Sequence, residues 1–503
     1  MKSLFLTLAL GTTLLALGAT APVMAQGSGR AGSLRTDTLR LTLDDALTRA
    51  LRQGDEVRLA ETQVEIADAQ VTAARATALP QLRLNSNYQH VVENARAQAV
   101  GSIFGQNNTY NSNLVLSQTL FQGGRVLAAN RAARRTGDAV RLDASEVQAQ
   151  MVVDVQRAYL NALFARRLVQ IQDSAVVLAS ERLAQVERLE QGGRAARFDV
   201  LRARVERANL EPLAIRARTD EELALLEIKR LLNVPAEQPM TLASTLDAGD
   251  VLAAVSARPD SAAPPVVDAR PAVRSAELVT QARQDAIRVA RADYLPTVGI
   301  SGIFGYLAFP TGGFLQNVPT SMGRLASVTC PPDSPPDRVC SEQNGGWFSD
   351  RSVAITVSWP LFDGLRTKAN VELAQAQAQV ADLQLAQARE RVAIEVASAR
   401  SEVARARSAF QAQQQTVAEA NEAYGLASLR FQRGLGTQLE ASDAQLALLI
   451  AQINEARAVY DVFLAAAELA RAEGRPIPLP TGGTAPLRTS SLPATSRADS
   501  PAR

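Results

Sequence analysis

Hydrophobic and polar positions along the chain follow two periods, and each period occurs twice. Residues 80–121 and 296–362 alternate apolar and polar side chains, which predicts β-strands. Stretches rich in Ala, Gln, Arg and Glu follow, from Arg125 to about Gln191 and from Arg366 to about Arg433, and their periodicity predicts helices. About 65 residues at a rise of about 1.5 Å give a helix near 100 Å long. Helices of that length imply coiled-coil support.

Two short segments mark the change from strand to helix and indicate a tandem duplication. Leu120-Phe121-Gln122-Gly123-Gly124-Arg125 is echoed 241 residues later by Leu361-Phe362-Asp363-Gly364-Leu365-Arg366. Glycine permits the sharp bend that each change requires. The same offset carries Gly193 onto Gly434 and Asp199 onto Glu440, so the chain holds two copies of one large unit. The candidate residues at these strand-to-helix turns are Phe121, Gly123, Arg125, Phe362, Gly364 and Arg366.

The remaining segments can be assigned around the duplication. A helix from about Leu41 to Leu79, which Thr42 or Asp44 can cap, ends at Pro80, and its counterpart ends at Pro296. A second helix follows each long one, at about 195–233 and 437–473, after a glycine turn. The expected divisions are an N-terminal segment at 26–43, helical regions at 44–79, 122–233, 271–295 and 363–473, a linker at 234–270 and a disordered tail at 474–503.

The strands at 80–121 and 296–362 have the features of membrane β-hairpins joined by extracellular loops. Each has about ten residues, the length of a tilted membrane strand. Twelve of the 22 aromatic residues lie in these two ranges, which fits the girdles at membrane interfaces. The alternative is a sheet of a soluble β-sandwich. The apolar face is expected to carry Leu82, Leu84, Tyr88, His90, Leu114, Leu116, Leu120, Val298, Ile300, Phe304, Tyr306, Val353, Ile355, Val357, Trp359 and Leu361.

The ends and the charge of the chain restrict its location. Residues 1–25 resemble a secretory signal peptide, with Lys2, an apolar run and the small-residue site Val23-Met24-Ala25; the alternative is a membrane anchor. The net charge of +2 is spread along the helices and predicts no nucleic-acid partner. Cys330 and Cys340 lie in an insertion of the second copy, and an exported protein is expected to bridge them, although two free thiols are the alternative.

Four membrane strands cannot close a barrel on their own, because known barrels start at about eight strands. Open sheet edges in lipid leave backbone groups unpaired, so several chains must pool their strands. The long helices must also associate, because they would otherwise expose their apolar seams. The polar strand faces would then line a lumen that the helices extend. This predicts an oligomeric outer-membrane conduit with a long periplasmic tube.

The order helix, Pro, strand, strand, Leu-Phe-x-Gly-Gly/Leu-Arg, long helix, glycine turn and second helix, twice over, resembles the TolC-type outer-membrane factor family from about Leu41 to Ala472. The resemblance implies a homotrimer with a twelve-stranded outer-membrane β-barrel continued by a periplasmic α-helical barrel. It also implies docking on a periplasmic adaptor (membrane fusion) protein and an inner-membrane transporter. The implied function is a passive conduit for small molecules in a tripartite efflux system. Type I protein secretion is the alternative, and the transported substrate stays open.

The resemblance also suggests functional residues at the two glycine turns. Asp199, Glu440 and Asp443 match acidic positions that form constriction rings in the family, while carboxylates that favour a helix start are the alternative. Gly436 stands where the family has a gating Arg, and Phe431 where it has a Tyr, so the family's lock is in doubt here. The turn residues expected to face the adaptor are Gly192, Gly193, Gly434 and Leu435.

Enzyme chemistry finds little support in the sequence. His90 is the only histidine, and no metal-ligand cluster, phosphate-binding glycine loop or nucleophile–base set is evident. We therefore expect neither catalysis nor a cofactor. The alternative from a different class is a structural coiled-coil protein of the cell envelope, which would not need two amphipathic β-hairpins.

Overall fold

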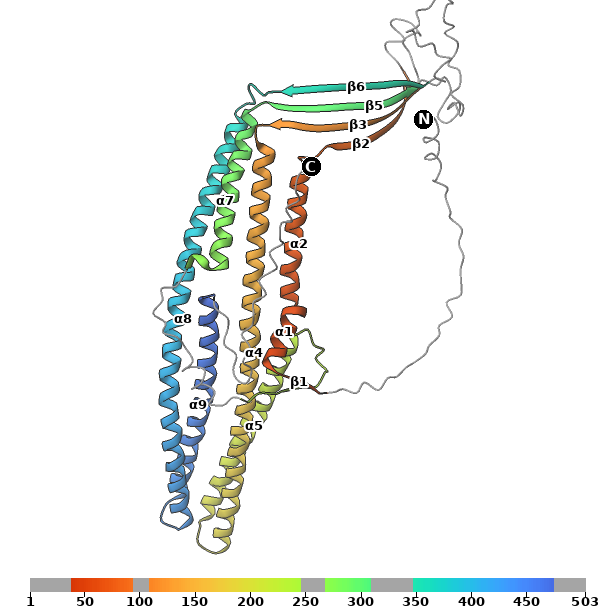
Figure 1. Ribbon diagram of the computed structural model, residues 1–503. Helices are drawn as coiled ribbons and strands as arrows, with labels where there is room; N and C mark the ends of the chain where they lie inside the picture. The colour runs from red at the N-terminus through yellow and green to blue at the C-terminus, as the bar shows by residue number, and fades with distance from the viewer. Residues whose placement is uncertain (1–37, 94–107, 246–266, 309–346, 475–503) are drawn as a thin grey trace, which may run out of the picture.

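The computed structural model describes residues 38–93, 108–245, 267–308 and 347–474, which form an elongated molecule with a β-sheet at one end and two helical hairpins at the other (Figure 1). The long helices α4 and α8 have 67 residues each, and their partners α5 and α9 have 35 each. The mainly helical, duplicated fold with a small β part is therefore confirmed. These four helices are α4 (Arg125–Gln191), α5 (Arg197–Leu231), α8 (Arg366–Gln432) and α9 (Gln438–Ala472).

Shorter helices support the long ones between the sheet and mid-height. α2 (Asp55–Ala76) packs along α4, and α7 (Pro271–Arg291) packs against both α4 and α8. Close approach is possible because small residues face the contacts, such as Ala128 and Ala139 of α4, which are almost fully buried. No helix of the described segments combines enough length with enough hydrophobicity to cross a membrane.

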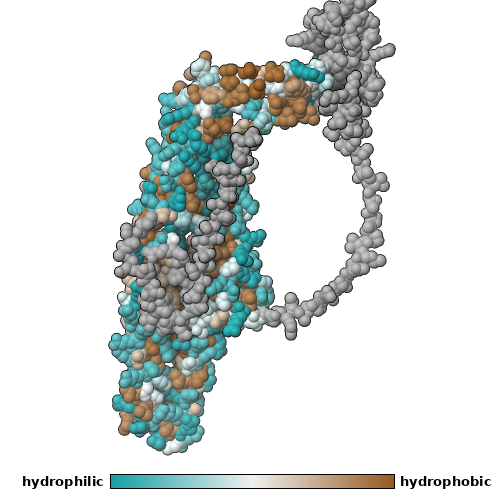
Figure 2. Space-filling view, viewed as in Figure 1, coloured by the Kyte–Doolittle hydropathy of each residue, from teal (hydrophilic) through white to brown (hydrophobic). Residues whose placement is uncertain are grey.

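The four long strands form one antiparallel sheet in the order β2-β3-β5-β6. Their register places Leu84, Leu114 and Phe304 in one row across one face, and Asn85 and Asn113 in a row on the other. Asn85 Nδ2 donates to Asn113 Oδ1 at 3.2 Å. The apolar side chains are exposed, and Figure 2 shows them gathered over the sheet. The strands are β2 (Gln81–His90), β3 (Asn108–Gln122), β5 (Thr297–Ala308) and β6 (Trp347–Ser358).

Two details of the strands differ from the sequence prediction. β6 ends at Ser358, so Trp359 and Leu361 lie beyond it, because Pro360 has no N–H with which to continue the ladder. Trp359 Nε1 instead donates to the carbonyl of Tyr294 at 3.1 Å. β3 contains a bulge at Leu120, which shifts the alternation, so that Phe121 rather than Leu120 pairs with Val298 in the apolar face.

The expected helix from Leu41 to Leu79 is divided in two. Thr42 caps α1 (Leu43–Gln53) as expected, because the Asp45 N–H donates to its Oγ1 at 3.1 Å. The chain then bends at Gly54, where a Cβ atom would lie 2.4 Å from the Ala50 carbonyl oxygen. Only glycine fits that bend without a shift of the backbone. The position of one glycine therefore breaks a helix that hydrophobic periodicity alone would continue.

The segment expected to be a linker contributes to the fold. β4 (Met240–Leu242) pairs in parallel with β1 (Leu39–Leu41). Short 3-10 helices flank α7, at Val267–Ala269 and Ala292–Tyr294. The small sheet covers an apolar cluster at mid-height in which Tyr159, Leu47 and Leu232 are at most 1% exposed. The Tyr159 hydroxyl donates to the Leu41 carbonyl at 3.2 Å, so the first copy is fixed here by apolar burial and a buried hydrogen bond.

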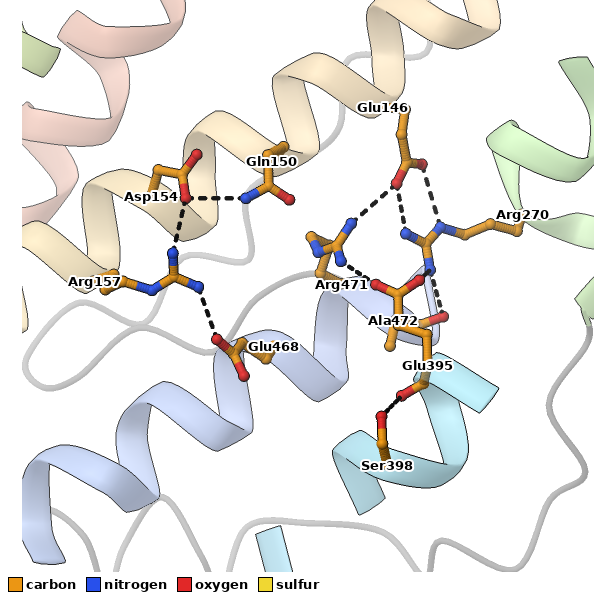
Figure 3. A network of polar contacts seen from close by, with 10 residues as sticks. All are labelled: Glu146, Gln150, Asp154, Arg157, Arg270, Glu395, Ser398, Glu468, Arg471 and Ala472. Atoms are coloured by element: carbon orange, nitrogen blue, oxygen red, sulfur yellow. Dashed lines mark hydrogen bonds and ion pairs between the residues drawn. The ribbon is translucent and has the colours of Figure 1, made fainter. Parts of the chain in front are cut away.

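A cluster of charged side chains joins α4, α7, α8 and α9 at mid-height (Figure 3). Arg270 Nη2 lies 2.5 Å from Glu146 Oε1, and its Nη1 donates to the carbonyl of Ala472 at 2.8 Å. Arg471 bridges Glu146 and Glu395. Burial alone would lower the pKa of Arg270, but hydrogen bonding and the charges of Glu146 and Glu395 outweigh it and raise the pKa. The start of α7 and the end of α9 are thereby joined through a permanently charged guanidinium.

Candidate functional site at the hairpin tips

Both hairpins turn through the same hydrogen-bonding motif. At the first tip, the Gly193 N–H donates to the Glu190 carbonyl and the Arg194 N–H to the Leu189 carbonyl, both at 2.8 Å. At the second, Gly434 donates to the Phe431 carbonyl at 3.0 Å and Leu435 to that of Arg430 at 2.9 Å. This is a Schellman motif, which requires a residue with positive φ. Gly193 and Gly434 have φ angles of 69° and 74°, so both glycines have a structural role in the turn itself.

The end surface of the tips is exposed and partly apolar. Gly192, Gly193 and Gly434 are exposed, and Leu435 is 70% exposed. Phe198, which the sequence analysis did not single out, is also 70% exposed at the first tip. The sequence could have pointed to Phe198, because it is the only aromatic residue between Phe164 and Tyr294. Two large apolar side chains therefore stand in solvent where the helices end.

The three candidate carboxylates differ in their surroundings. The Ala196 N–H donates to Asp199 Oδ2 at 3.2 Å, so Asp199 takes the helix-start role that was kept as the alternative. Glu440 is exposed in the first turn of α9, which Thr437 caps. A Cβ on Gly436 would lie 3.1 Å from Glu440 Oε2, so the carboxylate folds over this small residue. Asp443 is exposed one turn further along α9.

Asp443 also lines a groove between α5 and α9. The groove has a volume of about 430 Å³, and its walls include Arg202 and Glu206 of α5 and Leu446 of α9. Charged and apolar side chains alternate along it. The groove lies on the side of the helices, whereas Leu435 and Phe198 occupy their ends.

Phe431 joins the two hairpins of one chain. This half-buried ring at the end of α8 packs against an apolar cluster of the other hairpin. The cluster includes Leu183 and Val186 of α4 and Val200 of α5. Phe431 therefore has a packing role in addition to its place beside the second turn.

A buried arginine makes a second link between the hairpins, which could not be predicted from the sequence. Arg182 of α4 is only 7% exposed. Its Nη1 lies 3.4 Å from Glu206 Oε1 and donates to Ser442 Oγ at 3.2 Å, and Ser442 Oγ in turn donates to Glu206 Oε2 at 2.7 Å. The guanidinium also lies 6.0 Å from the ring centroid of Tyr424. The Arg182 node, meaning Arg182, Glu206, Tyr424 and Ser442, thus draws one residue from each of the four helices.

The strand-to-helix turns have the same backbone conformation in both copies, although Leu365 replaces a glycine in the second. Gly123, Gly124, Gly364 and Leu365 all have positive φ angles, and Leu365 is one of two non-glycine residues of the described segments in that region. A Cβ on Gly123 would lie 2.7 Å from the Ala292 carbonyl oxygen. Arg125 pairs with Asp293, whereas Arg366 and Phe362 are exposed. Cys330 and Cys340 lie outside the described residues.

A family model described as outer membrane efflux protein matches residues 46–234 and 266–475, which cover both copies of the repeat. The chain belongs to the outer membrane efflux protein family. The match runs through both hairpins, the sheet strands and the mid-height cluster. The protein is an outer-membrane efflux channel of TolC-like architecture, and members of the family are trimeric channels that work within tripartite pumps. The family and its structural relatives are channels rather than enzymes.

Individual relatives of this efflux protein are distant but cover most of its length. Protein CyaE of Bordetella pertussis is 26% identical over 414 residues, which span 80% of this chain and 78% of the relative. The solvent efflux pump outer membrane protein SrpC of Pseudomonas putida is 23% identical over 418 residues, 81% of each chain. The structure of the outer membrane protein VceC from Vibrio cholerae has a TM-score of 0.69 at 17% identity, covering 86% of this chain and 96% of that chain. That likeness concerns the fold.

Proposed function

We propose that three copies of this chain form a passive conduit that carries small molecules from a periplasmic adaptor and an inner-membrane pump across the outer membrane. The observation that carries this proposal is the sheet, in which the edge strands β2 and β6 each pair on one side only. Unpaired backbone groups in lipid cost several kcal/mol each. Three four-stranded sheets joined edge to edge would remove all such edges in a twelve-stranded barrel. The name of SrpC, a solvent efflux pump protein, supports a small-molecule substrate.

Docking on the adaptor is proposed at the end surface of the tips, formed by Gly192, Gly193, Gly434 and Leu435. Phe198 is added to this surface because it is as exposed as Leu435. Large exposed apolar side chains that cluster at one end of a molecule are typical of a protein interface. The glycines keep the turn tight, and the two apolar side chains would provide the contacts.

The gate is proposed at the same end, with a different lock from the one that the family resemblance implies. Gly436 offers no cation to Glu440, so an acid-to-Arg pair at that position is not available. The Arg182 node and Phe431 instead join the two hairpins of each chain. We propose that these contacts hold the tips together, and that Glu440 and Asp443 form acidic rings at the entrance. A role for Asp199 there is secondary, because its carboxylate already caps α5.

Two further proposals concern segments outside the described residues. Residues 1–25 are proposed to be removed on export, and the Cys330–Cys340 bridge is proposed to close an extracellular loop. The other sequence divisions, including the tail at 474–503, also stay predictions.

The proposal can be tested by measuring efflux in a strain that lacks its own copy of this gene and carries the wild-type or a variant chain instead. The wild-type chain should restore efflux of a fluorescent pump substrate, and Gly434→Glu should not, because it places a charged side chain on the docking surface. Gly434→Asn is the matched control, since Asn tolerates a positive φ better than other non-glycine residues. Trimer assembly should be the same in all three. Full efflux by Gly434→Glu would contradict docking through the tips.

A further inference from the structure

Three arginines stand at the helix ends nearest the sheet and form no ion pair within the described segments. Arg75 lies in the last turn of α2, Arg291 ends α7 and Arg366 begins α8, and all three are exposed. Within residues 38–93, 108–245, 267–308 and 347–474, none of them forms an ion pair with an acidic side chain. Arg125, the counterpart of Arg366 in the first copy, does form one, with Asp293. Each of the three guanidiniums is therefore available to an anion outside the chain.

The helix dipole explains only part of this arrangement. A cation in the last turn of a helix is favourable, which suits Arg75 and Arg291. A cation in the first turn is unfavourable, and α8 has no acidic residue there to offset Arg366. Asp363, three residues earlier, accepts hydrogen bonds from the N–H and the hydroxyl of Thr367. Together with these hydrogen bonds from Thr367, the charge of Arg366 helps to lower the pKa of Asp363, so the attraction between these two groups offsets part of the unfavourable dipole.

Two of the arginines, Arg75 and Arg291, precede the strands β2 and β5 closely along the chain. Arg75 and Arg291 each precede by five residues the proline that starts a strand, Pro80 and Pro296. Because α2 ends at Ala76 and α7 at Arg291, only a short connecting segment separates each arginine from its strand. The polar headgroup layer on each side of a bilayer is about 5–7 Å thick. If the apolar band of the sheet fills the hydrocarbon core, the side chains of Arg75 and Arg291 can reach the phosphates of the periplasmic leaflet.

We propose that Arg75, Arg291 and Arg366 form a ring that binds the phosphate groups of anionic phospholipids in the periplasmic leaflet of the outer membrane. Guanidinium is suited to this ligand because its planar fork donates two parallel hydrogen bonds to phosphate. Arg75 and Arg291 occupy equivalent positions in the two repeats, so a trimer presents both around its whole circumference, and Arg366 begins α8, which packs against α7. The ring fixes the height of the channel relative to the membrane, and thereby how far its tips extend into the periplasm.

Lipid retention by the intact trimer tests the ring. Wild-type trimers released from vesicles of phosphatidylglycerol and phosphatidylcholine should retain phosphatidylglycerol preferentially in native mass spectrometry. R75Q/R291Q/R366Q should lower that preference about fivefold for each arginine removed, and R75K/R291K/R366K should keep most of it. The matched control is R52Q/R274Q/R391Q, which removes three exposed arginines remote from the sheet and should leave the preference unchanged.

An unchanged preference in R75Q/R291Q/R366Q would overturn the proposal, as would an equal loss in the control. A changed anion current through the pore with unchanged lipid retention would place the arginines in the lumen and would also overturn it. So would displacement of the retained lipid by millimolar inorganic phosphate, because that result indicates a site for the free ion. If the triple variant does not assemble into trimers, the single variant R366Q is the test. Its preference for phosphatidylglycerol should fall about fivefold, and an unchanged preference would contradict the ring.

Discussion

At the scale of single residues, the Arg182 node is the most consequential contact. It contains one nearly buried guanidinium and one carboxylate, Glu206, which is 25% exposed. Leaving one partner of a buried pair alone costs about 3–5 kcal/mol, and partial exposure reduces that cost. Among the described segments, the Arg182 node is the only network of polar contacts that joins α4, α5, α8 and α9. Its loss should therefore affect how the hairpins associate more than how each one folds.

We expect Arg182→Ala to loosen the tips and make the channel leaky. The measurement is the resting conductance in planar bilayers, together with cellular uptake of an antibiotic too large for the closed pore, and both should rise. Arg204→Ala is the matched control, because Arg204 forms an exposed ion pair with Glu187 in the same hairpin. Such surface pairs contribute about 1 kcal/mol or less, so its conductance should stay at the wild-type level. Equal leakage in both variants would exclude a special role of the node.

The strained backbone of Leu365 gives a second prediction at this scale. A left-handed conformation costs a non-glycine residue about 1–2 kcal/mol, and Gly124 occupies the equivalent position in the first copy without that cost. Leu365→Gly should therefore raise the thermal stability of the trimer in detergent, and Gly124→Leu should lower it. The test is whether the two substitutions change the thermal stability in opposite directions. A loss of stability in both variants would mean that the Leu365 side chain makes contacts that outweigh the strain.

At the scale of elements, the sequence predicts what depends on local order and misses what depends on distant partners. The bounds of α4 and α8 follow from periodicity and from the glycines that flank them. The break at Gly54 and the bulge at Leu120 could not be predicted, because each depends on the approach of backbone or on pairing with another strand. The Arg182 node joins residues 24 and 260 positions apart, and one sequence holds no signal for such a contact. The capping role of Asp199 was foreseen only as an alternative.

The first two turns of α9 carry the prediction that belongs to this scale. Glu440 and Asp443 are three residues apart and both exposed, so they lie on one side of the helix. If that side faces the lumen, threefold symmetry produces two acidic rings that favour cations. Glu440→Ala with Asp443→Ala should lower cation selectivity and abolish block by trivalent cations added from the periplasmic side. Glu222→Ala with Glu237→Ala removes two exposed carboxylates away from the tips and should change neither property.

At the scale of the whole molecule, a single chain exposes apolar surface both on its sheet and along its helical hairpins. Its sheet exposes Leu84, Ile355 and Val357, each more than 60% accessible, and its edge strands lack partners on one side. Its helices also expose large apolar residues along α5 and α9, such as Ile215 and Leu446. Both features are unfavourable for an isolated chain in water. Association of three copies would pair the sheet edges and cover the apolar helix residues, and the lipid would cover the apolar face of the sheet. The proposed conduit therefore depends on the trimer more than on any single residue.

The mass of the assembled protein is the most direct test of the trimer. Full-length protein extracted from the outer membrane in a mild detergent should have three times the mass of the mature chain by light scattering corrected for bound detergent. Its circular dichroism should show that the β-signal is intact. A monomer with that signal intact would contradict the trimeric conduit, because a closed barrel cannot be built from the four-stranded sheet of one chain.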